Sequence, residues 1–87
     1  MTYDARQALF SSFLNGGVNG TQAIQNDAMG RPIYIGYAQA GSAKEAARWQ
    51  IRLITYDANG YITDVQFADG SEEFNKIWNS RVGYTYS

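Results

Sequence analysis

Apolar and polar residues alternate along two runs of the chain that flank residues 57–60. A period of two is typical of a β-strand with one buried face. The segment between the runs, Asp57-Ala58-Asn59-Gly60, has the composition of a tight turn. Gly60 suits the left-handed position of a three-residue hairpin loop, because glycine adopts that conformation without a steric penalty. The pattern therefore predicts an antiparallel hairpin with strands at 48–57 and 61–68.

The register of this hairpin follows from the length of its loop. A loop of residues 58–60 pairs Leu53 with Val65, whereas a loop one residue longer sets Leu53 opposite Asp64. The longer loop would scatter the apolar side chains over both faces of the hairpin, so we reject it. The chosen register places the apolar side chains on one face, namely Trp49, Ile51, Leu53, Val65 and Phe67.

A further strand and a helix are predicted on either side of the hairpin. Pro32 opens an extended apolar run, which predicts a strand at 33–38. After the hairpin, Asp69 and Glu72 have the spacing of a helix capping box. Phe74 and Trp78 then recur at helical spacing, which predicts a helix at 71–79.

The N-terminal third of the chain has a different character. Leu9, Phe10, Phe13 and Leu14 form one apolar stripe at helical spacing, and Asn15-Gly16-Gly17 ends it. Residues 15–31 are rich in glycine and asparagine and lack periodicity, so we expect a loop or arm there. We predict two parts: a helix and Gly/Asn-rich arm at 1–30, and a compact β-rich domain at 31–87. We find no internal repeat in the sequence.

The predicted fold class is therefore α+β. It comprises a small antiparallel three-stranded meander (33–38, 48–57 and 61–68), a C-terminal helix and an N-terminal helical arm.

Composition removes several kinds of chemistry. The 87-residue chain contains no cysteine and no histidine, so disulfides, thiolate metal sites and the commonest general base are excluded. Asp57 and Gly60 do not form a calcium loop, because that motif needs glycine at its sixth position and glutamate at its twelfth. The remaining carboxylates are explained as turn, strand or helix-start residues. We therefore predict no catalytic, cofactor-binding or metal-binding residues and no enzymatic activity.

Charge and hydropathy also narrow the partners. The formal net charge of −1 provides no basic surface for nucleic acid. No apolar run is long enough to span a membrane, and there is no polybasic segment for a lipid surface. We expect neither nucleic acid nor membrane as a partner.

Aromatic residues make up 15% of the chain, and side chains of this kind are enriched in protein interfaces. Trp49 and Trp78 are explained most simply as core residues. The tail Tyr84-Thr85-Tyr86-Ser87 alternates, so it either adds to a neighbour's sheet or closes this domain's own sheet. The candidate partner contacts are Phe10, Phe13, Tyr34, Tyr37, Tyr61, Tyr84 and Tyr86.

Part of the chain resembles a known group of proteins. The relevant segments are residues 32–38, Trp49-Gln50-Ile51-Arg52, residues 54–57 with Asn59-Gly60, Phe67-Ala68-Asp69-Gly70, Phe74, Ile77-Trp78, Arg81 and the final Tyr86-Ser87. They resemble small proteins encoded among the virion genes of tailed bacteriophages. The resemblance covers about residues 31–87 and carries over structural motifs, with no active-site residues.

The resemblance implies a structural role in the virion. We expect a protein that binds capsid or tail subunits and stabilises the particle, as a decoration protein or a neck or tail accessory, and that forms a homo- or hetero-oligomer. An alternative is an aromatic-lined module that binds a host glycan or receptor. A small inhibitor of a host enzyme is a third possibility. Presence in purified particles would distinguish the structural role from the other two.

Overall fold

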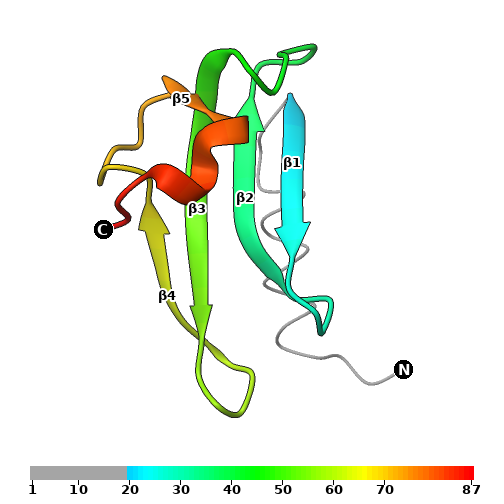
Figure 1. The fold of residues 1–87 in the computed structure, drawn as a ribbon, viewed down its shortest axis with the longest axis vertical. Helices are drawn as coiled ribbons and strands as arrows, with labels where there is room; N and C mark the ends of the chain where they lie inside the picture. Colours follow the sequence, from blue (N-terminus) through cyan, green and yellow to red (C-terminus); the bar gives the residue numbers. More distant parts are fainter. Residues whose placement is uncertain (1–19) are drawn as a thin grey trace.

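Residues 20–87 form an antiparallel β-sheet in the computed structural model, which describes this part of the chain (Figure 1). Four strands lie in chain order across the sheet: β1 (Thr21–Asn26), β2 (Pro32–Ala38), β3 (Ala47–Tyr56) and β4 (Ile62–Phe67). A short strand, β5 (Lys76–Ile77), pairs with the start of β3. It leads into a 3-10 helix, η1 (Trp78–Gly83).

The predicted meander is confirmed in part. The strands predicted at 33–38, 48–57 and 61–68 are present as β2, β3 and β4. The prediction of a loop at 15–31 was wrong for residues 21–26, which form β1 and pair with β2. The predicted boundary at residues 30 and 31 falls in the turn between these two strands. The predicted N-terminal helix lies outside the described residues.

The predicted C-terminal helix is matched only in part: no helix forms at 71–77, and the 3-10 helix η1 spans Trp78–Gly83. Asp69 and Gly70 both have positive φ, which directs the chain into a turn. Lys76 and Ile77 then pair with β3, and Trp78 is buried in the core. An isolated helix of this length is marginal, so strand pairing and burial of a tryptophan outweigh a favourable helix start.

A β-bulge changes the predicted register of the β3–β4 hairpin. The turn is as predicted, because Tyr56 pairs with Ile62 and the Asp57 N–H donates to the Tyr61 carbonyl at 2.8 Å. One residue of β4, Thr63, is then left without a partner on β3, and Leu53 faces Gln66 instead of Val65. A bulge inserts one extra residue into a strand and so transfers the following side chains to the other face. Val65 and Phe67 therefore lie on the face opposite Trp49 and Ile51.

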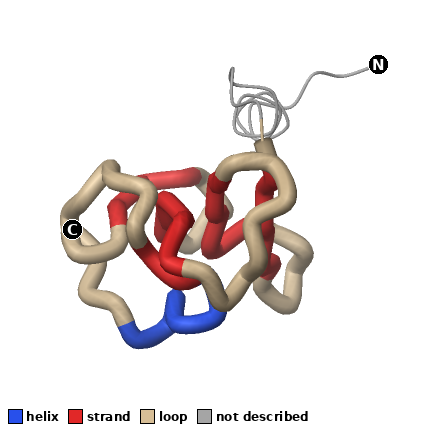
Figure 2. Tube along the Cα trace, turned by 90° about the horizontal axis from the view of Figure 1, so that it is seen from above, coloured by secondary structure: helices blue, strands red, loops and turns tan. Residues whose placement is uncertain are grey.

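Both faces of the sheet carry apolar clusters as a result. The first face, here the Trp face, is covered by η1 and the C-terminal tail, as Figure 2 shows for η1. The second, here the Tyr37 face, carries Ile35, Tyr37 and Ile54, flanked by Ile24, Tyr56 and Ile62. The buried residues of the Trp face are Ala23, Ala38, Trp49, Ile51, Ala68 and Trp78.

Two tryptophans form the centre of the Trp face, as the sequence predicted. The rings of Trp49 and Trp78 pack with their centroids 6.0 Å apart. The Trp49 indole N–H donates to the Ala43 carbonyl at 2.9 Å, so its polar atom is satisfied. Gly36 lies beneath both rings, and an added Cβ would stand 2.6 Å from a carbon of Trp78. The absence of a side chain at Gly36 thus allows the second tryptophan to reach the sheet.

Candidate interaction surface

The seven predicted contact residues have very different positions. Tyr61 is 60% exposed at the end of the β3–β4 turn. Tyr37 is only 2% exposed and belongs to the core of the Tyr37 face. Tyr34, Tyr84 and Tyr86 are partly buried against the Trp face. Phe10 and Phe13 lie outside the described residues.

The three partly buried tyrosines fasten the C-terminal tail to the sheet. The Tyr34 and Tyr86 rings lie 5.6 Å apart. The Tyr86 hydroxyl donates to the Arg81 carbonyl at 2.7 Å, and the Tyr84 hydroxyl accepts from the Ile77 N–H at 2.9 Å. Burial, followed by the neighbouring tyrosines, raises the pKa of Tyr86 well above its ordinary value. All three rings therefore pack within the chain, and the hydroxyls of Tyr84 and Tyr86 make intramolecular hydrogen bonds.

The tail itself pairs with this chain's own sheet. Phe67 and Ser87 exchange two backbone hydrogen bonds, at 3.0 and 3.2 Å. The Asp69 N–H donates to the Thr85 carbonyl at 2.6 Å, and Ala68 forms a bridge with Tyr86. Of the two arrangements that the sequence left open, the structure has the tail closing its own sheet.

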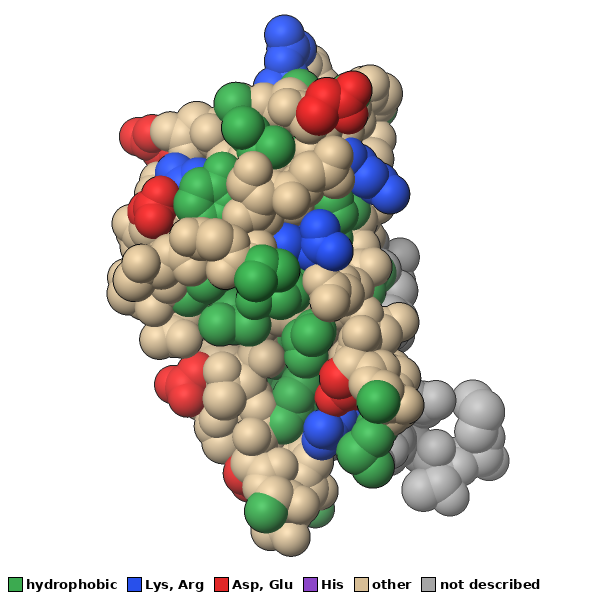
Figure 3. Space-filling view, in the orientation of Figure 1, with side chains coloured by type: hydrophobic (Ala, Val, Ile, Leu, Met, Phe, Trp, Pro, Cys, Tyr) green, Lys and Arg blue, Asp and Glu red, His purple; other side chains and the backbone are tan. Residues whose placement is uncertain are grey.

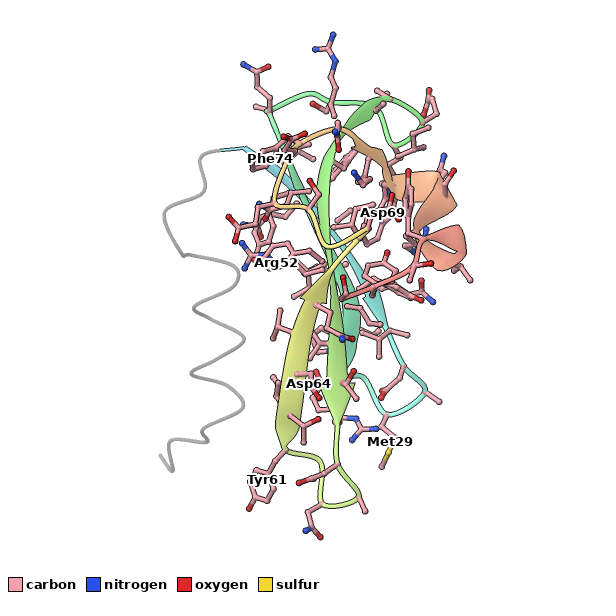
Figure 4. All side chains as sticks on the ribbon, turned by 90° about the vertical axis from the view of Figure 1, so that its left-hand side faces the viewer. Met29, Arg52, Tyr61, Asp64, Asp69 and Phe74 are labelled. Atoms are coloured by element: carbon pink, nitrogen blue, oxygen red, sulfur yellow. The ribbon has the colours of Figure 1, made fainter. Side chains whose placement is uncertain are left out.

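A different set of side chains is exposed along β4 and the loop that follows it. Tyr61, Val65 and Phe74 are 60%, 37% and 54% exposed. In Figure 4, Tyr61, Phe74 and Arg52 project toward the same side of the view, and the register places Val65 on the sheet face that carries Arg52. We call this set the β4 surface, comprising Tyr61, Val65 and Phe74. Figure 3 shows the Trp face, where hydrophobic side chains are interspersed with charged ones.

Sequence reasoning missed two members of the β4 surface. Val65 was assigned to the buried face because the register omitted the bulge. Phe74 was placed on one face of a predicted helix, together with Trp78, and no helix forms at residue 74. The start of β4, Ile62-Thr63-Asp64, offered no specific signal for a bulge.

Hydrogen bonds hold Tyr61 in place. The Asp57 carboxylate accepts from the N–H groups of Asn59 and Tyr61, at 2.9 and 3.0 Å. Gly60, with φ of 84°, takes the left-handed position and donates to the Asp57 carbonyl. Tyr61 is therefore presented from a turn whose backbone is already ordered.

Phe74 is held by a side-chain network that starts in β3. The Gln50 amide nitrogen donates to the Glu72 carbonyl at 2.7 Å, which anchors the loop to the sheet. The Gln50 amide oxygen accepts from the Arg52 guanidinium at 2.9 and 3.1 Å. The Ser71 hydroxyl oxygen accepts a further hydrogen bond from the Glu73 N–H at 3.1 Å. Gln50, although polar, is buried and satisfied by these partners.

Arg52 supplies a cation beside the β4 surface. Its guanidinium lies 4.8 Å from the Tyr37 ring centroid and 5.1 Å from that of Phe67. Stacking on two rings holds the charge in a defined position. Burial raises the pKa of Tyr37, and the Arg52 charge opposes this effect. The arrangement suits recognition of an apolar surface with an acceptor or anion near Arg52.

Residues 20–87 contain no group of three or more histidine, cysteine, aspartate or glutamate side chains placed to hold a metal ion. Within the same described range, no helix has the length and hydropathy needed to cross a membrane.

No family model matches the chain, and the searches of curated proteins and of solved structures found no significant match.

Proposed function

We propose that the protein is a non-enzymatic structural component of a tailed-bacteriophage virion, which binds capsid or tail subunits and stabilises the particle. The resemblance of residues 31–87 to small virion proteins suggests the setting. The observation that carries the proposal is the β4 surface: Tyr61, Val65 and Phe74 are large apolar side chains exposed along β4 and the loop that follows it. Exposed aromatic side chains on one side of a small domain favour contact with a protein surface.

The contact would use a surface that is ordered beforehand. The Asp57 carboxylate holds the turn that carries Tyr61, and Gln50 holds the loop that carries Phe74. A binding surface of this kind loses little conformational entropy on association. Arg52 would supply the polar contact at its margin.

The first test is the composition of particles purified from the phage that encodes the chain. We expect the protein at a fixed copy number that matches the symmetry of the capsid shell or of the neck and tail. Quantitative mass spectrometry of purified particles measures this number. Absence from particles would overturn the proposal.

The second test is substitution within the β4 surface. Tyr61→Ala and Phe74→Ala should each weaken binding to particles that lack the protein by about tenfold or more, as expected for aromatic anchors of an interface. Val82→Ala is the matched control, because Val82 is 72% exposed in η1, on the Trp face. Equal binding by all three variants would place the contact elsewhere.

An exposed tyrosine can also stack on a sugar ring. Tyr61 is therefore the residue with which the glycan-binding alternative can be tested. Binding of the purified protein to a glycan array, lost in Tyr61→Ala, together with absence from particles, would favour that alternative.

A further inference from the structure

The β1–β2 and β3–β4 hairpins have the same register. Ile24 pairs with Ile35 as Ile54 pairs with Val65, and Asn26 pairs with Pro32 as Tyr56 pairs with Ile62. Each hairpin also has a β-bulge at the same step, between Gln25 and Asn26 in one and between Thr55 and Tyr56 in the other.

The two turns are equivalent in sequence and in hydrogen bonding. Both read Asp-Ala-x-Gly, at residues 27–30 and 57–60. The Asp27 carboxylate accepts from the N–H groups of Met29 and Arg31, both at 2.9 Å, as Asp57 does from Asn59 and Tyr61. Gly30 and Gly60 have φ of 81° and 84°.

The equivalence continues beyond the hairpins. Ser42 donates its N–H to the Gln39 carbonyl at 3.1 Å, as Ser71 does to Ala68, and a glycine with positive φ precedes each serine. A Trp-x-x-Arg segment follows each of these two serines, at residues 49–52 and 78–81, and the rings of the two tryptophans pack on each other. The chain is thus built from two consecutive copies of one unit, residues 23–52 and 53–81. This corrects the conclusion from the sequence that no internal repeat is present.

The two copies differ at the strand that follows each tryptophan. After Trp49 the chain continues as β3 and pairs with β2, for example Tyr34 with Leu53 and Ile35 with Arg52. After Trp78 it turns into η1. Asn79 and Ser80 stand where the first copy has Gln50 and Ile51, and asparagine is disfavoured in strands. Among residues 20–87, no strand lies against β4 on the side where β3 lies against its counterpart β2.

The outer edge of β4 is only partly occupied. Ser87 takes both outward backbone groups of Phe67. Because these groups alternate along an antiparallel strand, those of Val65 point to the same side. None of the described residues pairs there, since β4 adjoins only β3 within the sheet. β4 contains no lysine or proline, the residues that commonly protect an edge strand.

We propose that the edge of β4 at residues 64–66 accepts an extended strand from a partner protein, antiparallel to β4, in the register in which β3 lies on β2. The internal repeat provides the template: the partner's residues would face Asp64, Val65 and Gln66 as Leu53, Arg52 and Ile51 face β2. The exposed Asp64 carboxylate calls for a basic residue directly opposite. The site adjoins the β4 surface and deepens the proposed function. The identity of the partner, a capsid or tail subunit, rests on that proposed function.

The probe is a peptide of residues 51–56 that carries Leu53→Lys, which places its lysine opposite Asp64 and ends before Phe67, whose outward groups Ser87 occupies. Added to the ¹⁵N-labelled full-length protein, it should shift the amide resonances of residues 63–67 and slow hydrogen exchange of the Val65 amide about tenfold or more. Val65→Pro removes the amide donor and should abolish binding, while Val65→Ala should retain it. No shift along β4 would overturn the proposal.

Charge reversal keeps the test informative if Val65→Pro fails to fold. Asp64→Lys should weaken binding of the Leu53→Lys peptide and strengthen binding of a Leu53→Glu peptide. Indifference to both exchanges would overturn the register. If the protein self-associates and Asp64→Lys abolishes that association, a second copy of the chain fills the edge. This result would overturn the proposal that a strand from a different protein binds there. Peptide binding by a protein that is absent from particles would support the edge site while the virion role fails.

Discussion

Asp27 shows how one side chain fixes a turn. Its carboxylate accepts two backbone N–H groups and lies 2.8 Å from the Arg31 guanidinium. These contacts, with the backbone bond from Arg31 foremost, hold the pKa of Asp27 below its ordinary value of 3.8. The ionised form is therefore favoured by the fold.

The stability of the protein should depend on the charge of Asp27 in acid. Because the pKa is lower in the folded state, the stabilisation is present above pH 3.8 and is lost as the pH falls through the folded value. In Asp27→Asn, the decline in Tm between pH 5 and pH 2 should be shallower than in the wild type. Thermal melts followed by circular dichroism measure this slope, and parallel profiles would contradict the prediction.

Gly36 shows the effect of an absent side chain. Gly36→Ala should lower the free energy of unfolding by about 1–3 kcal/mol, because the new methyl group would stand 2.6 Å from the Trp78 ring and 3.0 Å from the Trp49 ring. Gly83→Ala is the control, since no atom lies within 4 Å of a Cβ there. Urea denaturation gives both values. A Gly36→Ala variant as stable as the control would show that the indole rings shift at little cost.

At the scale of elements, pairing partners decided which segments became strands. β5 has only two residues, yet its pairing with β3 and the burial of Trp78 replace the expected helix. η1 follows at once, and its Arg81 stacks on the Trp78 ring at 4.6 Å. The C-terminal tail then returns to Phe67, held by the tyrosine contacts described above.

The Tyr86 hydroxyl should control how firmly the tail is held. Tyr86→Phe removes the bond to the Arg81 carbonyl and should cost about 1 kcal/mol, the usual net value of such a bond. Exchange of the Phe67 amide, which donates to Ser87, should become faster than in the wild type. Unchanged exchange at Phe67 would mean that ring packing against Tyr34 alone holds the tail.

At the scale of the whole molecule, β3 connects the two repeated units. It pairs with β2, β4 and β5, and it contributes to the clusters on both faces. The duplication also explains why one edge of the sheet is incomplete: the second unit ends in η1 where the first ends in a strand. The β4 surface and the open edge thus lie together, which is a suitable arrangement for contact with another subunit.

Local chemistry was readable from the sequence alone. Strands β2, β3 and β4, the Asp57–Gly60 turn and the core positions of Trp49 and Trp78 follow from alternation, turn composition and residue size, which act over short distances. The exposure of Tyr61 follows from the same turn.

The tertiary structure decided the rest. The bulge at Thr63 transferred Val65 to the other face, and pairing with β3 converted a predicted helix into β5 and η1. Residues 21–26 form the strand β1 because they pair with the edge of β2. The bulge and the conversion to β5 and η1 depend on hydrogen bonds and burial between segments distant along the chain, and a local pattern carries no information about such partners. For β1 a local signal was present, because residues 27–30 repeat the Asp-Ala-x-Gly sequence of the turn at 57–60.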